Sequence, residues 1–124
     1  MILCDTNIFI EIYRNNEIII QAIKQIGQEN LVVSDITCAE LFFGARNKKE
    51  LQAISKDLEK LEVLPVNTFI SSLSVKLVKD YSLSHKLALP DAIIAATPIY
   101  HNLPLYTLNI KDFIFIDNVK LFSF

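Results

Sequence analysis

The sequence contains few glycines and cysteines, and each scarcity excludes a class of site. Gly27 and Gly44 are the only glycines among 124 residues, so there is no glycine-rich loop to bind a nucleotide phosphate. Cys4 and Cys38 are too few for a disulfide scaffold and lack the spacing of a metal knuckle. We expect both to pack as small apolar residues. The two histidines are isolated in the sequence, and we expect them at the surface.

Long apolar runs are also missing, and the charge is close to balanced. No apolar segment is long enough to span a bilayer, and no secretory signal is recognisable, so we expect a cytoplasmic protein without membrane contact. Twelve basic and 14 acidic residues give a net charge of −2, which provides no broad attraction for nucleic acid. A hydrophobic fraction of 52% excludes a disordered chain, and the length fits a single domain, residues 1–124.

Strand-like and helical patterns alternate along the chain, which predicts an α/β fold. The expected architecture is a sandwich around a central, mainly parallel sheet of four to five strands. The expected strands are Ile2–Asp5, Leu31–Val33, Val63–Val66, Pro104–Thr107 and Phe113–Ile116. The expected helices are Thr6–Arg14, Glu17–Ile26, a helix carrying Glu40 that begins at Ser34 or Asp35, Asn47–Glu62, Phe69–Lys86 and Asp91–Tyr100. Pro98 should kink the last of these helices or end it early.

Four carboxylates lie where apolar segments end or turn, namely Asp5, Glu40, Asp91 and Asp112. Burial of such acids is costly unless a positive charge compensates them. Ligands of parallel sheets gather at the carboxyl ends of the strands, so we expect the four acids to meet there. Carboxylate oxygens are the ligands that Mg²⁺ and Mn²⁺ prefer, and this set therefore predicts a metal site.

The predicted metal site suits phosphodiester hydrolysis, because a bound ion activates water and screens phosphate charge. Four neighbouring polar residues are candidates for supporting hydrogen bonds: Thr6, Asn7, Thr107 and Asn109. Three basic residues are candidates for contacts with the phosphate backbone: Arg14, Arg46 and Lys111. If metal neutralised the four acids, basic residues would outnumber the remaining acidic ones.

Each acid also has a simpler structural interpretation. Asp5 is placed to cap the following helix, and Asp91 to interact with a helix dipole just after Pro90. Glu40 is a candidate for a structural salt bridge, and Asp112 for a turn residue. The metal site disappears only if all four simpler interpretations hold together.

Four segments of the chain resemble the PIN-domain ribonucleases, especially the VapC-like toxins of type II toxin–antitoxin pairs. They are Ile2–Asn7, Ile36–Gly44, Leu89–Thr97 and Leu103–Phe113. Their order and spacing extend the resemblance over nearly the whole chain. The resemblance implies a three-layer α/β/α fold and Mg²⁺- or Mn²⁺-dependent endonucleolytic cleavage of RNA. It further implies a homodimer and inhibition by a cognate antitoxin.

By the same resemblance, Asp5, Glu40 and Asp91 correspond to the metal-binding acids. The fourth position is Asp112 or Asn109, and we choose Asp112.

The early helices are more apolar than one buried face requires, so part of their surface is expected to bind a partner.

Two other functions are compatible with an α/β domain of this size. A catalytically silent PIN-like module would bind protein or RNA, although such modules usually lack the core acids. A receiver-type phosphoryl-transfer domain would need a second acidic cluster and a lysine after a late strand. Leu108 and Asn109 occupy that place here, which disfavours this alternative.

Overall fold

A parallel five-stranded sheet forms the centre of the computed structural model, which describes all residues 1–124. The strand order is β3-β2-β1-β4-β5, and every pairing is parallel. The strands are β1 (Ile2–Cys4), β2 (Leu31–Ser34), β3 (Glu62–Leu64), β4 (Pro104–Tyr106) and β5 (Lys120–Leu121). The predicted parallel sheet is confirmed.

Six α-helices connect the strands, and polar caps start five of them. The helices are α1 (Thr6–Tyr13), α2 (Glu17–Ile26), α3 (Asp35–Phe43), α4 (Lys48–Leu58), α5 (Thr68–His85) and α6 (Leu89–His101), with 3-10 turns at Gln28–Asn30 and Ile110–Asp112. The side chains of Asp5, Asn16, Ser34, Asn47 and Asn67 accept hydrogen bonds from the first turns of α1 to α5. These bonds satisfy backbone donors that lack a partner inside the helix. Local sequence therefore defines most helix starts.

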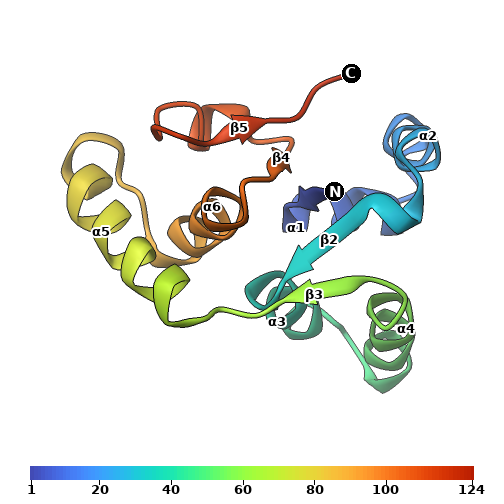
Figure 1. The fold of residues 1–124 in the computed structure, drawn as a ribbon. Coiled ribbons are helices and arrows are strands. Elements are labelled where there is room, and N and C mark those ends of the chain that lie inside the picture. Colours follow the sequence, from blue (N-terminus) through green and yellow to red (C-terminus); the bar gives the residue numbers. More distant parts are fainter.

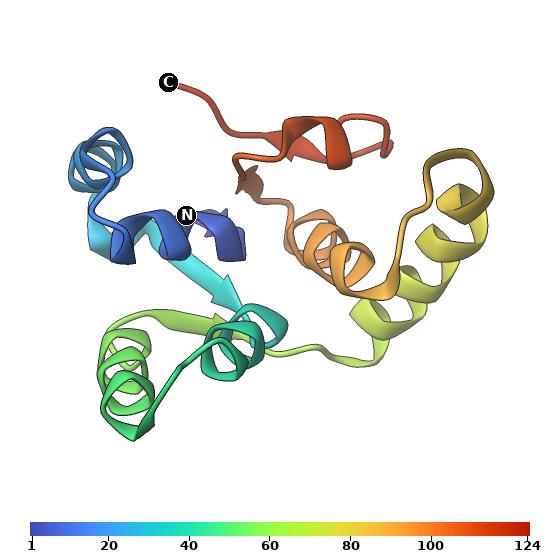
Figure 2. The same cartoon turned by 180° about the vertical axis from the view of Figure 1, so that it is seen from behind.

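Helices cover both faces of the sheet, because neighbouring strand residues point to opposite sides. Leu3 and Val32 pack against α5 and α6, whereas Cys4 and Val33 pack against α1, α2, α3 and α4. Figures 1 and 2 show α5 beside α6, with α2 and α4 at the other end of the molecule. The predicted three-layer α/β/α arrangement is confirmed.

One predicted strand and the end of one predicted helix are wrong. Phe113–Ile116 is not a strand, because Phe113 and Ile116 are buried within turns of the loop after β4. The fifth strand is Lys120–Leu121, which pairs with Pro104 and Leu105. The helix expected over Asn47–Glu62 ends at Leu58, since Glu62 pairs with Val32 in the sheet.

An early end of the helix at Pro98 is also wrong, because α6 continues to His101. Proline removes one backbone donor, which usually weakens a helix interior. Here Pro98 is fully buried in α6, which packs along α5, and this packing offsets the missing bond. The residue that caps the C-terminus of α6 is Asn102, whose left-handed backbone has a φ of 55°. None of the helices combines the length and apolar character needed to cross a membrane.

Candidate active site

The carboxyl ends of β1 and β4 form the point where the strand order reverses. The chain proceeds from β1 to β2 and β3 on one side, and places β4 on the other side of β1. In open parallel sheets, ligands bind in the crevice at such a switch point. Asp5 directly follows β1, and Thr107 directly follows β4. The two side chains meet there, since the Thr107 hydroxyl donates to Asp5 Oδ2 at 2.8 Å.

Asp5 both caps α1 and contributes a buried carboxylate to this crevice. Its Oδ1 accepts a hydrogen bond from the backbone N–H of Thr6 at 2.7 Å, and only 5% of the residue is exposed. Burial raises the pKa of Asp5, while the bonds from Thr107 and Thr6 oppose this shift and the charges of Glu40 and Asp112 add to it. The capping interpretation is therefore correct but incomplete.

Glu40 is held by a hydroxyl rather than by a cation. The Thr6 hydroxyl donates to Glu40 Oε1 at 2.8 Å and lies 3.0 Å from the hydroxyl of Thr37. No lysine or arginine forms an ion pair with Glu40. The alternative prediction of a structural salt bridge is therefore wrong.

Among the acids of the site, Asp91 has the most strongly shifted pKa. It lies in the first turn of α6 and is half-buried. Burial, together with the negative charges of Asp5, Asp112 and Glu40, raises the pKa of Asp91 to about 6. Asp112 lies in the 3-10 turn after β4, and its negative charge contributes to the raised pKa of both Asp5 and Asp91. The four predicted acids therefore share one electrostatic environment.

The predicted supporting residues form one hydrogen-bonded network around Thr107. Its hydroxyl accepts from the backbone N–H of Asn109 at 3.0 Å and from Asn7 Nδ2 at 3.5 Å. Asn7 Oδ1 in turn accepts from the N–H of Leu108 at 3.3 Å. Asn109 contributes its backbone N–H to this network. The loop after β4 is thereby tied to the start of α1.

The donor set fits a hard divalent cation, because it consists of carboxylate oxygens without a neutralising cation. Burial raises the pKa values of Asp5 and Asp91, and the charges of the neighbouring acids raise them further, so a bound ion would favour their ionised forms. No three acidic, histidine or cysteine side chains already converge on one coordination point. Metal binding by three of these acids would therefore require their side chains to move from the positions seen here.

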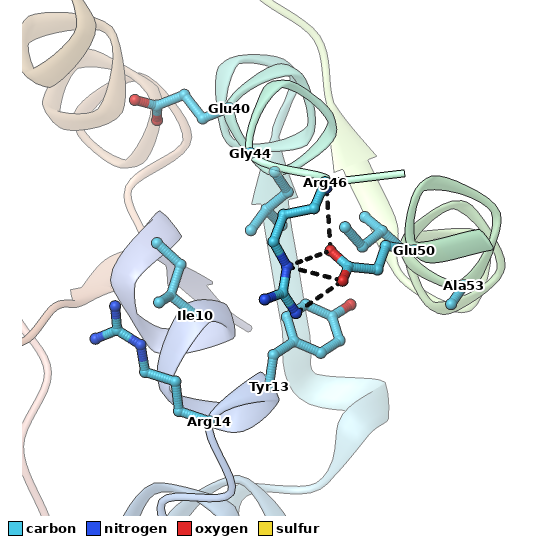
Figure 3. Close-up of a pocket in the computed structure, with 10 residues that line it drawn as sticks. Ile10, Tyr13, Arg14, Glu40, Gly44, Arg46, Glu50 and Ala53 are labelled. Atoms are coloured by element: carbon cyan, nitrogen blue, oxygen red, sulfur yellow. Dashed lines mark hydrogen bonds and ion pairs between the residues drawn. The ribbon is translucent and has the colours of Figure 1, made fainter. Parts of the chain in front are cut away.

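Two of the predicted phosphate-binding residues line a cavity of about 610 Å³ between α1, α3 and α4. Arg46 is engaged there by Glu50, with Nη2 to Oε2 at 2.8 Å, and Arg14 lies 3.3 Å from Glu11. Figure 3 shows the Arg46–Glu50 pair and the Glu40 carboxylate, which points away from that pair. Sequence patterns did not predict this cavity, which combines residues from three helices. The third basic residue, Lys111, lies in a second cavity with Asp91 and Asp112.

The model of the PIN domain matches residues 2–116 of the chain. The chain belongs to the PIN domain family. A toxin–antitoxin complex from Klebsiella pneumoniae contains a similar chain, with 34% identity, coverage of 96% and 95% of the two chains and a TM-score of 0.82. A chain of VapBC-1 from nontypeable Haemophilus influenzae is 30% identical, with coverage of 99% of this chain and 98% of that chain and a TM-score of 0.80. A chain of VapBC2 from Rickettsia felis, bound to a promoter DNA fragment, is 26% identical, with coverage of 100% of this chain and 99% of that chain and a TM-score of 0.82. No curated protein sequence matches the chain.

Thr107→Val should destabilise this PIN domain, because valine keeps the branched shape but removes the hydroxyl. Asp5 Oδ2 and the N–H of Asn109 then lose a partner inside the protein. The expected loss in the free energy of unfolding is about 1–3 kcal/mol. Urea denaturation measures this loss, and Thr107→Ser, which keeps the hydroxyl, serves as the control. Equal stability of all three proteins would contradict the importance of this network.

Proposed function

We propose that this PIN domain is a Mg²⁺- or Mn²⁺-dependent endoribonuclease that acts as the toxin of a toxin–antitoxin pair. The observation that supports the proposal best is the electrostatic coupling of Asp91 with Asp5, Glu40 and Asp112 at the switch point of the sheet. The similar chains in toxin–antitoxin complexes support the toxin role. A cytoplasmic location follows from this proposal, since its RNA substrate is found there.

Asp5, Glu40, Asp91 and Asp112 are the proposed metal-binding residues. When bound, a divalent ion supplies Lewis-acid chemistry, lowering the pKa of water and neutralising charge on the phosphate. Thr107 and the Thr6 N–H fix both oxygens of Asp5, and the Thr6 hydroxyl orients Glu40. These bonds restrict the side-chain motion that would otherwise lower metal affinity.

We further propose that an antitoxin segment binds the cavity between α1, α3 and α4. Half of the ten residues that line it are hydrophobic, and it extends to Glu40 in the candidate active site. A bound segment would therefore be close enough to obstruct the site. Ile10 lines the cavity with 39% of its surface exposed, which agrees with the expectation of a partner surface on the early helices.

The proposed homodimer has a suitable apolar surface on α5 and α6. Phe69 and Tyr100 stack with ring centroids 5.8 Å apart, although 67% and 45% of these residues are exposed. Val75 is 63% exposed on the same pair of helices. Burial of these side chains against a second copy would remove apolar surface from water.

RNA cleavage by the purified protein tests the catalytic proposal. We expect the wild type to cut single-stranded RNA internally with Mg²⁺ or Mn²⁺, and EDTA to stop the reaction. Asp5→Asn should lose at least about 100-fold in rate, because removing a group that only supports a ligand already costs about 10–100-fold. Glu59→Gln, which changes an exposed acid at the end of α4, should retain full activity.

The same assay separates the proposal from the alternative of a silent binding module. Binding of RNA or protein without cleavage under any of these metal conditions would favour the silent module. Cleavage that Asp5→Asn leaves unchanged would contradict the assigned site.

A further inference from the structure

A second cavity, of about 180 Å³, opens beside the candidate active site. It lies between the end of α5, the start of α6 and the loop after β4, and it shares Asp91 and Asp112 with the site. The remaining lining residues are His85, Lys86, Leu87, Lys111 and Phe115. A substrate bound at these two acids would therefore extend directly into this cavity.

An aromatic pair borders the cavity and is held in a defined orientation. The rings of His85 and Phe115 stack with centroids 3.9 Å apart and an interplanar angle of 5°. Tyr81 packs edge-on against Phe115, at 5.3 Å and 62°. The Ser84 hydroxyl lies 2.8 Å from His85 Nδ1. The other ring nitrogen, Nε2, forms no hydrogen bond within the protein. His85 is exposed, so an incoming group has access to its ring.

Two lysines border the same cavity without an ion pair. Lys86 follows α5 in a left-handed conformation with a φ of 56°, and Lys111 lies in the 3-10 turn next to Asp112. Both are exposed, and neither forms a salt bridge, although Asp91 and Asp112 line the cavity with them. These cations remain available for an anionic ligand.

We infer that this cavity is a nucleotide subsite, in which a base adjacent to the scissile phosphate stacks on the His85–Phe115 pair and Lys86 and Lys111 contact the RNA backbone. The inference rests on the proposed function and deepens it. Aromatic platforms combined with basic side chains are the general means of binding single-stranded nucleic acid. Only two of the seven lining residues are hydrophobic, so the cavity suits a nucleotide better than an apolar protein segment.

Stacking is tested by RNA binding in the Asp5→Asn background, with EDTA present so that cleavage does not interfere. Fluorescence anisotropy with a short single-stranded RNA should show about 5–150-fold weaker binding for His85→Ala. His85→Phe should restore binding, because phenylalanine keeps a stacking ring. His101→Ala, which removes the other exposed histidine, should bind like the parent protein.

An abasic ribose-phosphate oligomer of the same length separates base stacking from backbone contacts. His85→Ala should not weaken its binding further, whereas the double variant Lys86→Gln/Lys111→Gln should weaken binding of both oligomers. For RNA, each lysine lost should reduce the slope of log K against log[salt] by about 0.7. Lys79→Gln, at an exposed lysine of α5 outside the cavity, is the matched control.

Equal RNA binding by His85→Ala and its parent would overturn the subsite, as would equal weakening by His85→Phe. A selective loss of protein binding in these variants would assign the cavity to a protein partner instead and also overturn the inference. Failure of the proposed function is distinct, since it appears as absence of metal-dependent cleavage by the wild type. Thermal unfolding of each variant verifies that the fold is retained.

Discussion

Replacement of Asp91 by asparagine is expected to abolish RNA cleavage and to stabilise the metal-free protein. The expected loss of activity is at least about 100-fold, because the variant lacks a proposed metal ligand. Stability should rise because asparagine is nearly the same size, avoids the cost of burying a charge, and removes the repulsion from Asp5, Asp112 and Glu40. Such a gain is typical of functional sites, where residues are selected for activity at the expense of stability.

The stability gain of Asp91→Asn should depend on pH. The pKa of Asp91 rises from 3.8 to about 6 on folding, so the native wild type binds more protons than the unfolded chain in that interval. The contribution of Asp91 to the free energy of unfolding therefore falls as pH rises through the interval. The variant should match the wild type below it and exceed it by about 1 kcal/mol above it, once solvent screening of this half-exposed group is included.

Urea denaturation at several pH values, with EDTA and then with Mn²⁺, measures this effect. Manganese should stabilise the wild type and have little effect on the variant, because binding to the native state alone raises its stability. Glu59→Gln should follow the wild type under all conditions. A metal-free variant that is less stable than the wild type at neutral pH would contradict the predicted cost of the buried Asp91 charge.

Phe113→Ala should cause a large loss of stability, about 3–5 kcal/mol in the free energy of unfolding. Phe113 is 1% exposed and belongs to the core between the sheet and α5 and α6. Alanine would leave a cavity that the surrounding strands and helices cannot easily fill. The loop that carries Asp112 should also lose its anchor, so cleavage should decrease beyond the effect on stability.

The neighbouring residue provides a matched control for Phe113. Ile114 is 68% exposed, and Ile114→Ala should change stability by no more than about 0.5 kcal/mol. Urea unfolding of both variants gives the comparison. Similar losses for the two substitutions would contradict the assignment of Phe113 to the core.

The predicted helices and strands were correct where local signals define them. Asn16 and Asn67 cap helices through bonds to residues two or three positions away, and such contacts depend on adjacent sequence alone. The fifth strand was missed because Lys120–Leu121 becomes a strand only by pairing with Pro104 and Leu105. Conversely, Phe113–Ile116 has the apolar composition of a strand, but its residues fill a core within a turn.

The features of the candidate site were likewise predictable from the sequence only in part. Its acids were identified from the sequence, because a carboxylate at the end of an apolar segment requires an explanation whatever the fold. The stacking of His85 on Phe115 was not predicted, since 29 intervening residues separate them and neither belongs to a recognisable motif. The cavity between α1, α3 and α4 also depends on how three helices pack.

The sequence by itself determined the fold class, the family and the four acids, because these depend on short segments whose composition and order are visible along the chain. Only the tertiary structure decided that Thr107 bonds to Asp5, that Glu40 lacks a salt bridge, and that His85 and two lysines border the acids. The physical reason is that burial and charge coupling depend on distances in space, which parallel strand pairing establishes between residues far apart in sequence.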